Sequence, residues 1–427
     1  MPLARLDVRG LGDRLEEVLP RPETVDPDVR EAVSAIIAEV RRGGDAGLLA
    51  LTSRFDKVEI ASIAVPPDEI GAALARVPDE LREALEVAHR RIVAYHRRDT
   101  DDDPHDFFTE GVRVTEVVRP MRRAGCYAPG GRARYPSTVL MCAAPARVAG
   151  VEEVVLCVPP APDGNVDDAT LAAAAIAGVD EIYRVGGAQA IAAMAYGTES
   201  IRRVDVIVGP GNRYVAEAMR QVSGAVGIPA AFAGPSEVVV VAGPDTPAEL
   251  AAIDLAVQAE HGPGGLSWLV TWSQQKLDEV DAALDRIVAA SPRRAELEAT
   301  LSSGGYACLV EGPEEAIAVA NVVAPEHLEL LIDDARRLLP LVEAAGAVFL
   351  GPWSPASLGD YVAGPNHVLP TNRSARFASA LSARDFRRHI HAVEADRDAI
   401  ELLGPHVIAL ARTEGLAAHA ESIEARR

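Results

Sequence analysis

Hydrophobic residues recur along the first quarter of the chain at helical spacing. They do so from Val29 to Val40, where Gly43-Gly44-Asp45 follows as a stop signal, and again from Pro78 to Arg98. Both stretches carry arginine and glutamate on the opposite face, which is typical of helices on the outside of a domain. We expect His89 and His96, in the second stretch, to be ordinary surface residues.

After Gly111 the pattern changes to short β-branched runs, which end at glycine or proline and are followed by alanine-rich helical stretches. The expected strands are Val154–Val158, Glu181–Val185, Val204–Val208, Glu237–Ala242 and Ser267–Thr271. The expected helices are 188–196, 214–222, 247–260 and 277–290. This alternation predicts the α/β class, with doubly wound parallel sheets.

The chain of 427 residues exceeds what one hydrophobic core normally supports, so at least two domains are expected. We assign residues 1–25 to an N-terminal segment and 26–120 together with 237–380 to a first α/β domain that carries the chemistry. Residues 121–236 form the second α/β domain, on the cofactor side. The polar stretch 381–427 reads as a small helical tail.

The composition narrows the function by exclusion. Hydrophobic residues make up 48% of the chain and aromatic residues only 4%, so the interior is built from small aliphatic side chains. A formal net charge of −21 excludes nucleic acid and anionic membranes as partners, and it tolerates a cationic small molecule. Much of this charge is explained by solubility alone.

Cysteine usage and the N-terminus indicate the compartment. Cys126, Cys142, Cys157 and Cys308 form no Cys-x-x-Cys pair, which argues against a disulfide scaffold, a zinc ribbon or an iron-sulfur cluster. The N-terminus lacks an apolar signal core, and no uninterrupted apolar run reaches about 18 residues. We expect a reduced, cytoplasmic protein.

The stretch from Gly351 to Pro370 is built largely from glycine, proline and polar residues. It carries Asp360 and His367, and its breakers predict a rigid loop that is neither a regular helix nor a strand. A proline-rich surface connection is the alternative reading. Because charged solvating residues are almost absent, we expect this loop to be covered.

Two further segments carry candidate chemistry. Asp254, Gln258 and His261 share one face of a helix just before glycine and proline end it, which favours a metal or, alternatively, simple hydrogen bonding of the histidine. Glu326 and His327 follow Pro325 and give two proton-transfer groups of different intrinsic pKa. The alternative for this pair is the first turn of a helix.

Glycine-rich turns after two expected strands are candidates for phosphate binding. Gly186-Gly187 and Gly209-Pro210-Gly211-Asn212 stand where backbone amides approach a ligand in open parallel sheets. Neither is a Gly-x-Gly-x-x-Gly fingerprint or a Walker loop, so ordinary strand-to-helix turns remain the alternative. Near the C-terminus, His419 shares a helical face with Leu416 and Ile423, which is typical of packing in a core or an interface.

Taken together, these blocks resemble the histidinol dehydrogenase family over nearly the whole chain. The matching segments are 40–45, 127–131, 135–141, 185–190, Gly209-Pro-Gly-Asn212, Gly234-Pro-Ser-Glu237, Gln258-Ala-Glu-His-Gly-Pro263, Ala324-Pro-Glu-His-Leu328, 354–370 and Glu414-Gly-Leu-x-x-His419. The resemblance implies two incomplete Rossmann-like domains in a domain-exchanged homodimer.

The resemblance also implies a set of site residues. Gln258, His261, Asp360 and His419 fall on the ligands of one Zn²⁺ per subunit, with Glu414 and His419 coming from the partner subunit. The positions that match substrate contacts are Ser236, Gln258, His261, Glu326, His327, Asp360, His367, Glu414 and His419. Tyr127, Gln189 and Asn212 match positions that hold NAD. Manganese or cobalt would suit the same ligands.

The implied reaction is the NAD-dependent four-electron oxidation of L-histidinol through L-histidinaldehyde to L-histidine, the end of histidine biosynthesis. His327 would act as general base, and Glu326 would activate water for the second oxidation.

Several positions depart from the family pattern. Val206, Met219 and Ala230 replace residues that are commonly charged, and Thr371-Asn372-Arg373 and Ser379-Ala380-Leu381 replace glycine-bearing versions. These departures keep open a paralogue that oxidises another hydroxylated substrate, such as a sulfonated diol. A non-catalytic α/β binding protein is a third reading, and the joint presence of the proposed bases and ligands argues against it.

Overall fold

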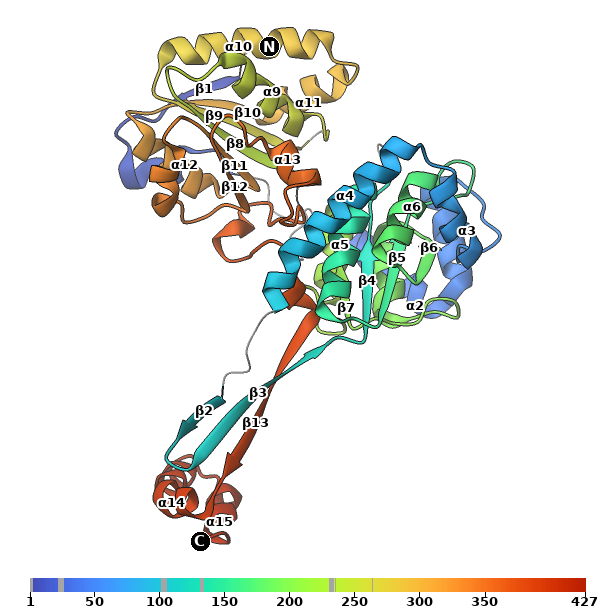
Figure 1. The fold of residues 1–427 in the computed structure, drawn as a ribbon, viewed down its shortest axis with the longest axis vertical. Helices are drawn as coiled ribbons and strands as arrows, with labels where there is room; N and C mark the ends of the chain where they lie inside the picture. The colour runs from blue at the N-terminus through green and yellow to red at the C-terminus, as the bar shows by residue number, and fades with distance from the viewer. Residues whose placement is uncertain are drawn as a thin grey trace.

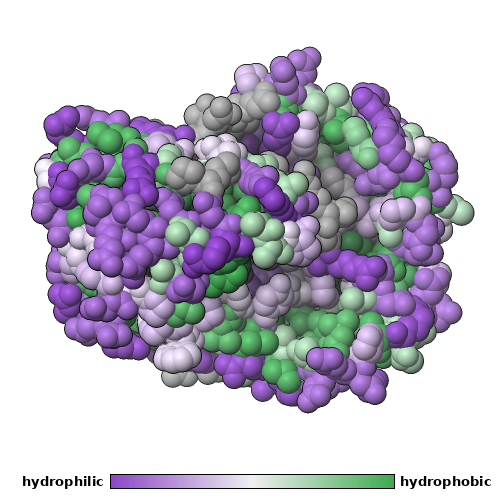
Figure 2. Space-filling view, turned by 90° about the horizontal axis from the view of Figure 1, so that it is seen from above, coloured by the Kyte–Doolittle hydropathy of each residue, from purple (hydrophilic) through white to green (hydrophobic). Residues whose placement is uncertain are grey.

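The computed structural model describes residues 3–21, 27–100, 106–130, 134–229, 234, 236–262 and 264–427. Two lobes, each built on a parallel sheet, are joined to an antiparallel ribbon that ends in two helices (Figure 1). The face of the molecule in Figure 2 is largely hydrophilic, with hydrophobic side chains in scattered patches. Within the described ranges, no helix combines the length and apolar character needed to cross a membrane.

The first lobe contains a six-stranded parallel sheet in the order β1-β10-β9-β8-β11-β12. Its strands are β1 (Ala4–Asp7), β8 (Glu237–Ala242), β9 (Leu266–Thr271), β10 (Gly305–Leu309), β11 (His327–Leu331) and β12 (Ala347–Leu350). One face is covered by α9 (Ala248–Ala259), α10 (Gln274–Ala290) and α11 (Arg294–Gly304), and the other by α1 (Leu15–Val18) and α12 (Pro313–Val323). Numbered from β8, the five strands of this sheet that follow β1 in the chain have the doubly wound order 3-2-1-4-5, and β1 lies at the edge beside β10.

The second lobe contains a four-stranded parallel sheet in the order β6-β5-β4-β7. Its strands are β4 (Arg123–Tyr127), β5 (Glu153–Val158), β6 (Glu181–Arg184) and β7 (Val206–Val208). One face carries α3 (Pro67–Ala72), α4 (Asp79–His96), α5 (Pro136–Ala149) and α6 (Asp168–Ala177), and the other α2 (Pro27–Asp56), α7 (Gly187–Tyr196) and α8 (Arg213–Val222). The predicted α/β class is therefore confirmed.

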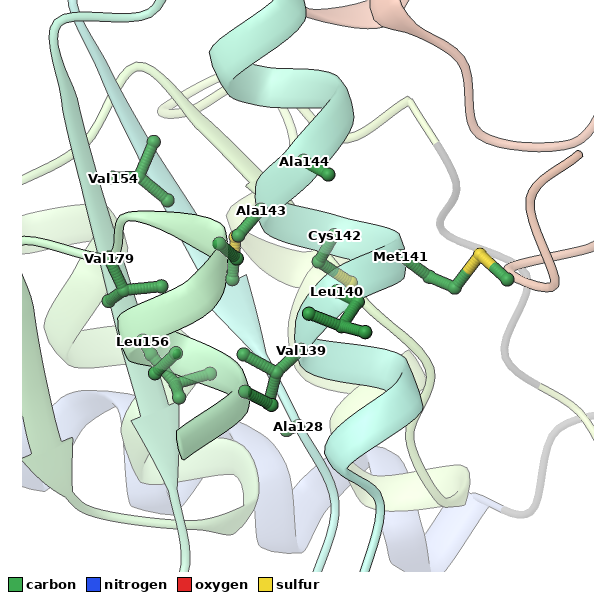
Figure 3. Close-up of a cluster of buried hydrophobic side chains, with 14 of the residues drawn as sticks. Ala128, Val139, Leu140, Met141, Cys142, Ala143, Ala144, Val154, Leu156 and Val179 are labelled. Atoms are coloured by element: carbon green, nitrogen blue, oxygen red, sulfur yellow. The ribbon is translucent and has the colours of Figure 1, made fainter. Parts of the chain in front are cut away.

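Small side chains let helix α5 lie close to the sheet of the second lobe. Cys142, Ala143 and Ala144 of α5 are at most 1% exposed, and they belong to the same buried cluster as Val154 and Leu156 of β5 (Figure 3). All four cysteines are buried and free, in agreement with the expected absence of a disulfide scaffold. Burial raises the pKa of each thiol.

The N-terminal helices belong to a different lobe from the one we assigned. Residues 27–96 pack on the four-stranded sheet, because α2 contacts α7 and α8 while α4 contacts α5. The segment placed before them instead contributes β1 to the edge of the six-stranded sheet. The expected stop near Gly44 is a kink within α2, where that residue has a φ of 51°.

The prediction that His96 is a surface residue is wrong. Its side chain is 1% exposed, and Nδ1 lies 2.9 Å from Oδ2 of Asp99. Leu85, Ala88 and Ile92 form the buried face of α4, and His96 continues that face by one more turn. Burial lowers the pKa of His96.

The C-terminal tail is only partly helical. It contains β13 (Arg387–Ala395), which pairs along its whole length with β3 (Val112–Pro120), and β3 also pairs with β2 (Asp106–Thr109). The helices α14 (Arg397–Thr413) and α15 (Ala417–Glu424) follow at the far end of this ribbon (Figure 1). The strand escaped prediction because its stability comes from pairing with a segment more than 250 residues away.

The breaker-rich stretch also holds a short helix that we did not expect. Residues Ala356–Tyr361 form α13, which starts after Pro355 in an extended conformation and carries Asp360 near its end. His367 lies on the irregular segment that follows, as predicted. Proline at the start of a helix is compatible with helical geometry, so breakers at the flanks did not exclude a helix between them.

Candidate active site

The acid and imidazole side chains gather at the amino edge of the six-stranded sheet. His327 opens β11 and Glu326 precedes it, and the parallel register places His327 opposite Val238 of β8. The backbone N–H of Glu237 donates to Oε2 of Glu326 at 3.2 Å. Ser236, a predicted substrate contact, directly precedes this residue. The cluster thus lies at the edge opposite to the one where open parallel sheets usually bind ligands.

His327 lies between two carboxylates. Its Nε2 is 3.3 Å from Oδ1 of Asp360, and its Nδ1 is 3.7 Å from Oε2 of Glu326. Burial lowers the pKa of His327, but the two carboxylates outweigh it and raise the pKa to about 9. Burial raises the pKa of Glu326, whereas the bond to His327 holds the pKa of Asp360 below its usual value. The three groups form one electrostatically interacting unit.

The loop after α13 ties this unit to the second lobe. Nδ1 of His367 lies 2.8 Å from the carbonyl oxygen of Asp360, and its Nε2 lies 3.1 Å from Oγ1 of Thr138 on α5. Asn366 donates from Nδ2 to the carbonyl oxygen of Met141 at 2.6 Å. Burial lowers the pKa of His367, which favours the neutral ring. The loop is therefore held between the lobes.

The end of α9 supplies candidate metal ligands. The side chain of Gln258 is 2% exposed, and its Nε2 has no hydrogen-bond partner among the residues that the structure describes. His261 places Nδ1 3.3 Å from the carbonyl oxygen of Gln258, which leaves Nε2 for a ligand. His261 also interacts electrostatically with Asp360 and Glu326. This donor set fits a mixed N/O site that needs completion, because no three His, Cys, Asp or Glu side chains converge on a metal position within the described ranges.

Asp254 and Glu329 form a buried carboxyl pair near His327, and from the sequence we named only Asp254. Glu329, two residues along β11, is hydrogen-bonded to Asp254 of α9, and its Oε1 accepts from the backbone N–H of Ala356 at 2.8 Å. Burial raises the pKa of both carboxyls, as expected when a pair shares a proton. The pair connects α9, β11 and α13, which carry the metal candidates and the base. The sequence did offer a signal for Glu329, because residues two apart in a strand, such as His327 and Glu329, lie on the same face of the sheet.

The predicted cofactor residues lie together at the carboxyl edge of the four-stranded sheet. Tyr127, Gln189 and Asn212 line a cavity of about 2670 Å³. The Tyr127 hydroxyl accepts from the backbone N–H of Gly187 at 3.0 Å, and Asn212 caps α8 by accepting from Tyr214 at 2.9 Å. The cavity thus begins at the switch point between β4 and β7, where the N-termini of α7 and α8 begin.

Glycine is required at the point where these two strands end. Gly209, directly after β7, has a φ of 125°, and a Cβ atom there would lie 2.1 Å from the carbonyl oxygen of Tyr127. The close approach holds the ends of β4 and β7 together beside the cavity. His261, Gly264 and Gly265 of the first lobe line the same cavity, so it extends from the cofactor residues to the metal candidates.

Glu414 and His419 are not brought to this site by their own chain. Both are exposed near the end of the ribbon, far from both lobes in Figure 1. Helix α15 packs on α14 through Ala420 and Ile423, while Leu416 stays 42% exposed. Their placement therefore leaves open the predicted role in a partner subunit.

Two of the departures from the family pattern lie away from the clustered side chains, whereas the backbone of Asn372 and Arg373 contacts the carboxyl of Glu237, the residue whose N–H donates to Glu326. Val206 and Met219 are fully buried in the core of the second lobe. Asn372 and Arg373 adopt left-handed φ values of 54° and 63°, the region that favours glycine. Ala230 lies outside the described residues.

Comparison with known proteins identifies relatives along the whole chain. The sequence profile of the histidinol dehydrogenase family matches residues 19–427. A histidinol dehydrogenase of Parasynechococcus marenigrum is 47% identical over 93% of this chain and 91% of its own, and one of Gluconobacter oxydans is 44% identical over 99% of both. The crystal structure of histidinol dehydrogenase from Elizabethkingia anophelis superposes with a TM-score of 0.93 at 34% identity, over 99% of this chain and 98% of that one.

Proposed function

Because this chain belongs to the histidinol dehydrogenase family, we propose that it oxidises L-histidinol through L-histidinaldehyde to L-histidine, with NAD as the electron acceptor. The observation that carries this proposal is the Glu326–His327–Asp360 unit, which lies beside His261 where that residue lines the cofactor cavity. Two adjacent proton-transfer groups would suit a dehydrogenase site.

We assign the binding roles as follows. Gln258, His261 and Asp360 would hold zinc, completed by His419 of a partner subunit, and Tyr127, Gln189 and Asn212 would hold NAD. Bound zinc would supply the positive charge that holds the substrate, and bound NAD would supply the hydride acceptor. Ser236, His367 and a partner's Glu414 would contact the substrate.

The proton transfers fall to two side chains of this chain. His327 would accept the hydroxyl proton in the first oxidation as the neutral ring, a form that becomes more populated as the pH rises toward its raised pKa of about 9. Glu326 is 8% exposed and would take a proton from the water that attacks the aldehyde. His327 would act again as the hydrate loses its second hydride. Adjacent bases suit two successive oxidations on one bound substrate.

The exposed apolar residues of the ribbon and tail support a homodimer. Ile390 and Val393 of β13 are 51% and 65% exposed, and Leu402 and Leu410 of α14 are 54% and 65% exposed. Burial of these side chains against a second copy would remove apolar surface from water. Light scattering after size exclusion tests this directly: a mass of one chain would contradict the dimer.

The function is tested by the stoichiometry of NADH. We expect two NADH per L-histidinol from the zinc-loaded protein, and an excess of unconverted L-histidinaldehyde from Glu326→Gln. Glu343→Gln, which alters an exposed carboxylate, serves as the matched control and should behave as wild type. Turnover of a sulfonated diol without turnover of histidinol would instead identify the paralogous activity.

A further inference from the structure

Asp56 is a carboxylate in the cofactor cavity to which the proposed reaction gives no role. It is the last residue of α2 and lines the cavity together with Tyr127. Its Oδ2 is buried and has no hydrogen-bond partner among the described residues. Burial raises the pKa of Asp56 to about 6. A carboxylate at the negative end of a helix dipole is also unfavourable, so its own surroundings do not explain it.

The position of Asp56 is defined by the strands beside it. Asp56 interacts electrostatically with Tyr127, the last residue of β4, and the parallel register pairs Tyr127 with Cys157 of β5. Asp56 is therefore near the Tyr127 hydroxyl, and it lines the same cavity as Val158, the last residue of β5, which is the second strand of this sheet counted from β4. In doubly wound sheets that bind dinucleotides, an acid near the end of the second strand binds the hydroxyls of the adenosine ribose.

The second strand of this sheet does not supply such an acid itself. After Val158 the chain continues with Pro159 and Pro160, which line the cavity without a hydrogen-bonding side chain. Asp167, later in the same connection, is committed as the cap of α6, where it accepts from the backbone N–H of Thr170 at 3.0 Å. Asp56 comes instead from α2, a helix that is not part of the connection between β5 and α6.

We propose that Asp56 accepts hydrogen bonds from the adenosine ribose hydroxyls of NAD and excludes NADP by repelling its 2′-phosphate. The inference rests on the proposed NAD-dependent function. A carboxylate accepts from two vicinal hydroxyls, and it faces a like charge when one of them is phosphorylated. Arg54 and Arg220 line the same cavity and would otherwise favour the additional phosphate. The negative charge of Asp56 is thus the element that discriminates.

The test is equilibrium binding of NAD and of NADP to the full-length, metal-free protein by isothermal titration calorimetry. We expect wild type to prefer NAD by about a hundredfold, since like charges in contact are strongly unfavourable. Asp56→Asn should weaken NAD binding about tenfold and bring the two affinities to within a few-fold of each other. Asp56→Glu, which keeps the charge, should retain the discrimination against NADP.

Glu31→Gln is the matched control, because Glu31 is an exposed carboxylate on the same helix, away from the cavity lining. Its preference for NAD should equal that of wild type, and the melting temperature of each variant reports whether it is folded. An unchanged ratio of affinities in Asp56→Asn, or an equal shift in Glu31→Gln, would overturn the role of Asp56 alone. Failure of wild type to bind NAD would overturn the proposed cofactor together with this inference.

Discussion

The two parallel sheets follow the same doubly wound order but use opposite edges. The six-stranded sheet gathers its titratable groups, Glu326, His327 and Asp360, at the amino edge. The four-stranded sheet offers helix N-termini and glycine turns at its carboxyl edge, around Tyr127 and Asn212. We propose that one lobe moves protons and that the other holds the cofactor. Strand order alone therefore does not locate the chemistry of a lobe.

The usual ligand position of the six-stranded sheet is closed by a side chain. The hydroxyl of Thr246 bridges the carboxyl ends of β8 and β11, because it accepts from the backbone N–H of Gly243 at 2.9 Å and donates to the carbonyl oxygen of Leu331. Helices α9 and α13 instead carry their C-terminal residues back to the amino edge. In the four-stranded sheet the corresponding position between β4 and β7 remains part of the cavity.

The largest expected effect is on kcat, and it tests whether the amino edge of the six-stranded sheet and the cofactor cavity have separate roles. His327→Asn should lower kcat with saturating NAD by about a thousandfold, because general acid–base groups contribute on this scale. Binding of NAD, measured by calorimetry, should change less than about twofold, since the imidazole does not line the cofactor cavity. Equal losses in kcat and in NAD affinity would contradict the division of labour.

The next largest effect concerns the close approach of the ends of β4 and β7. Gly209→Ala should destabilise the protein by about 3 kcal/mol or more, because its Cβ would collide with the backbone of Tyr127 at a left-handed φ. Gly224→Ala is the control: its φ is 95°, but nothing lies within 4 Å of the added Cβ. Urea unfolding of both variants measures the difference. A similar loss in the two would show that strain, and not the close approach, dominates.

A smaller effect is expected behind the active site. Glu329→Ala removes the partner of Asp254 and of the Ala356 N–H, and should cost about 2 kcal/mol of stability. Glu329→Gln keeps the hydrogen-bonding shape and should lose less. Urea unfolding gives the free energies, and a loss in Glu329→Gln as large as in Glu329→Ala would contradict a shared hydrogen bond.

The Glu329–Asp254 pair also predicts how the free energy of unfolding changes with pH. Because burial raises the pKa of Glu329, the folded state holds a proton that the unfolded chain releases near pH 4.5. The resulting stability is fully present below pH 4.5 and is lost as the pH rises through the raised folded-state pKa. Glu329→Gln should show a flatter dependence between pH 5 and pH 9 (roughly the window over which this linkage acts).

The smallest effect belongs to the helix cap in the cofactor lobe. Asn212→Ala should destabilise the protein by about 1 kcal/mol, because two backbone N–H groups of α8 lose their acceptor. It should also weaken NAD binding several-fold while leaving the kcat at saturating NAD close to wild type. A large loss of kcat would show that the two edges are coupled more tightly than their geometry indicates.

Local patterns predicted what depends on local interactions. The β-branched runs and alanine-rich helices of the two sheets were evident in the sequence, as were the adjacency of Glu326 and His327 and the face shared by Gln258 and His261. The buried position of His96 was also readable, since it extends the apolar face of α4 by one turn. We nevertheless predicted an exposed His96, because histidine is often exposed in proteins.

Features that depend on distant partners were not predictable in this way. The strand β13 is stabilised by pairing with β3, and the carboxyl of Glu329 by Asp254 on another element. The assignment of α2 and α4 to a lobe depends on which sheet their apolar faces meet, and amphipathic spacing does not specify the partner. The residues of the site were predicted by resemblance, whereas the closed edge at Thr246 emerged only from the fold.

The buried thiols of the two lobes can be used to measure how fast each lobe unfolds. Cys126, Cys142 and Cys157 lie in the core of the second lobe, and Cys308 lies in that of the first. A reagent that alkylates thiolates will reach each of them only when its lobe unfolds, because burial both covers the sulfur and raises its pKa. Mass spectrometry of timed alkylation would therefore rank the two lobes by opening rate in the unmodified protein.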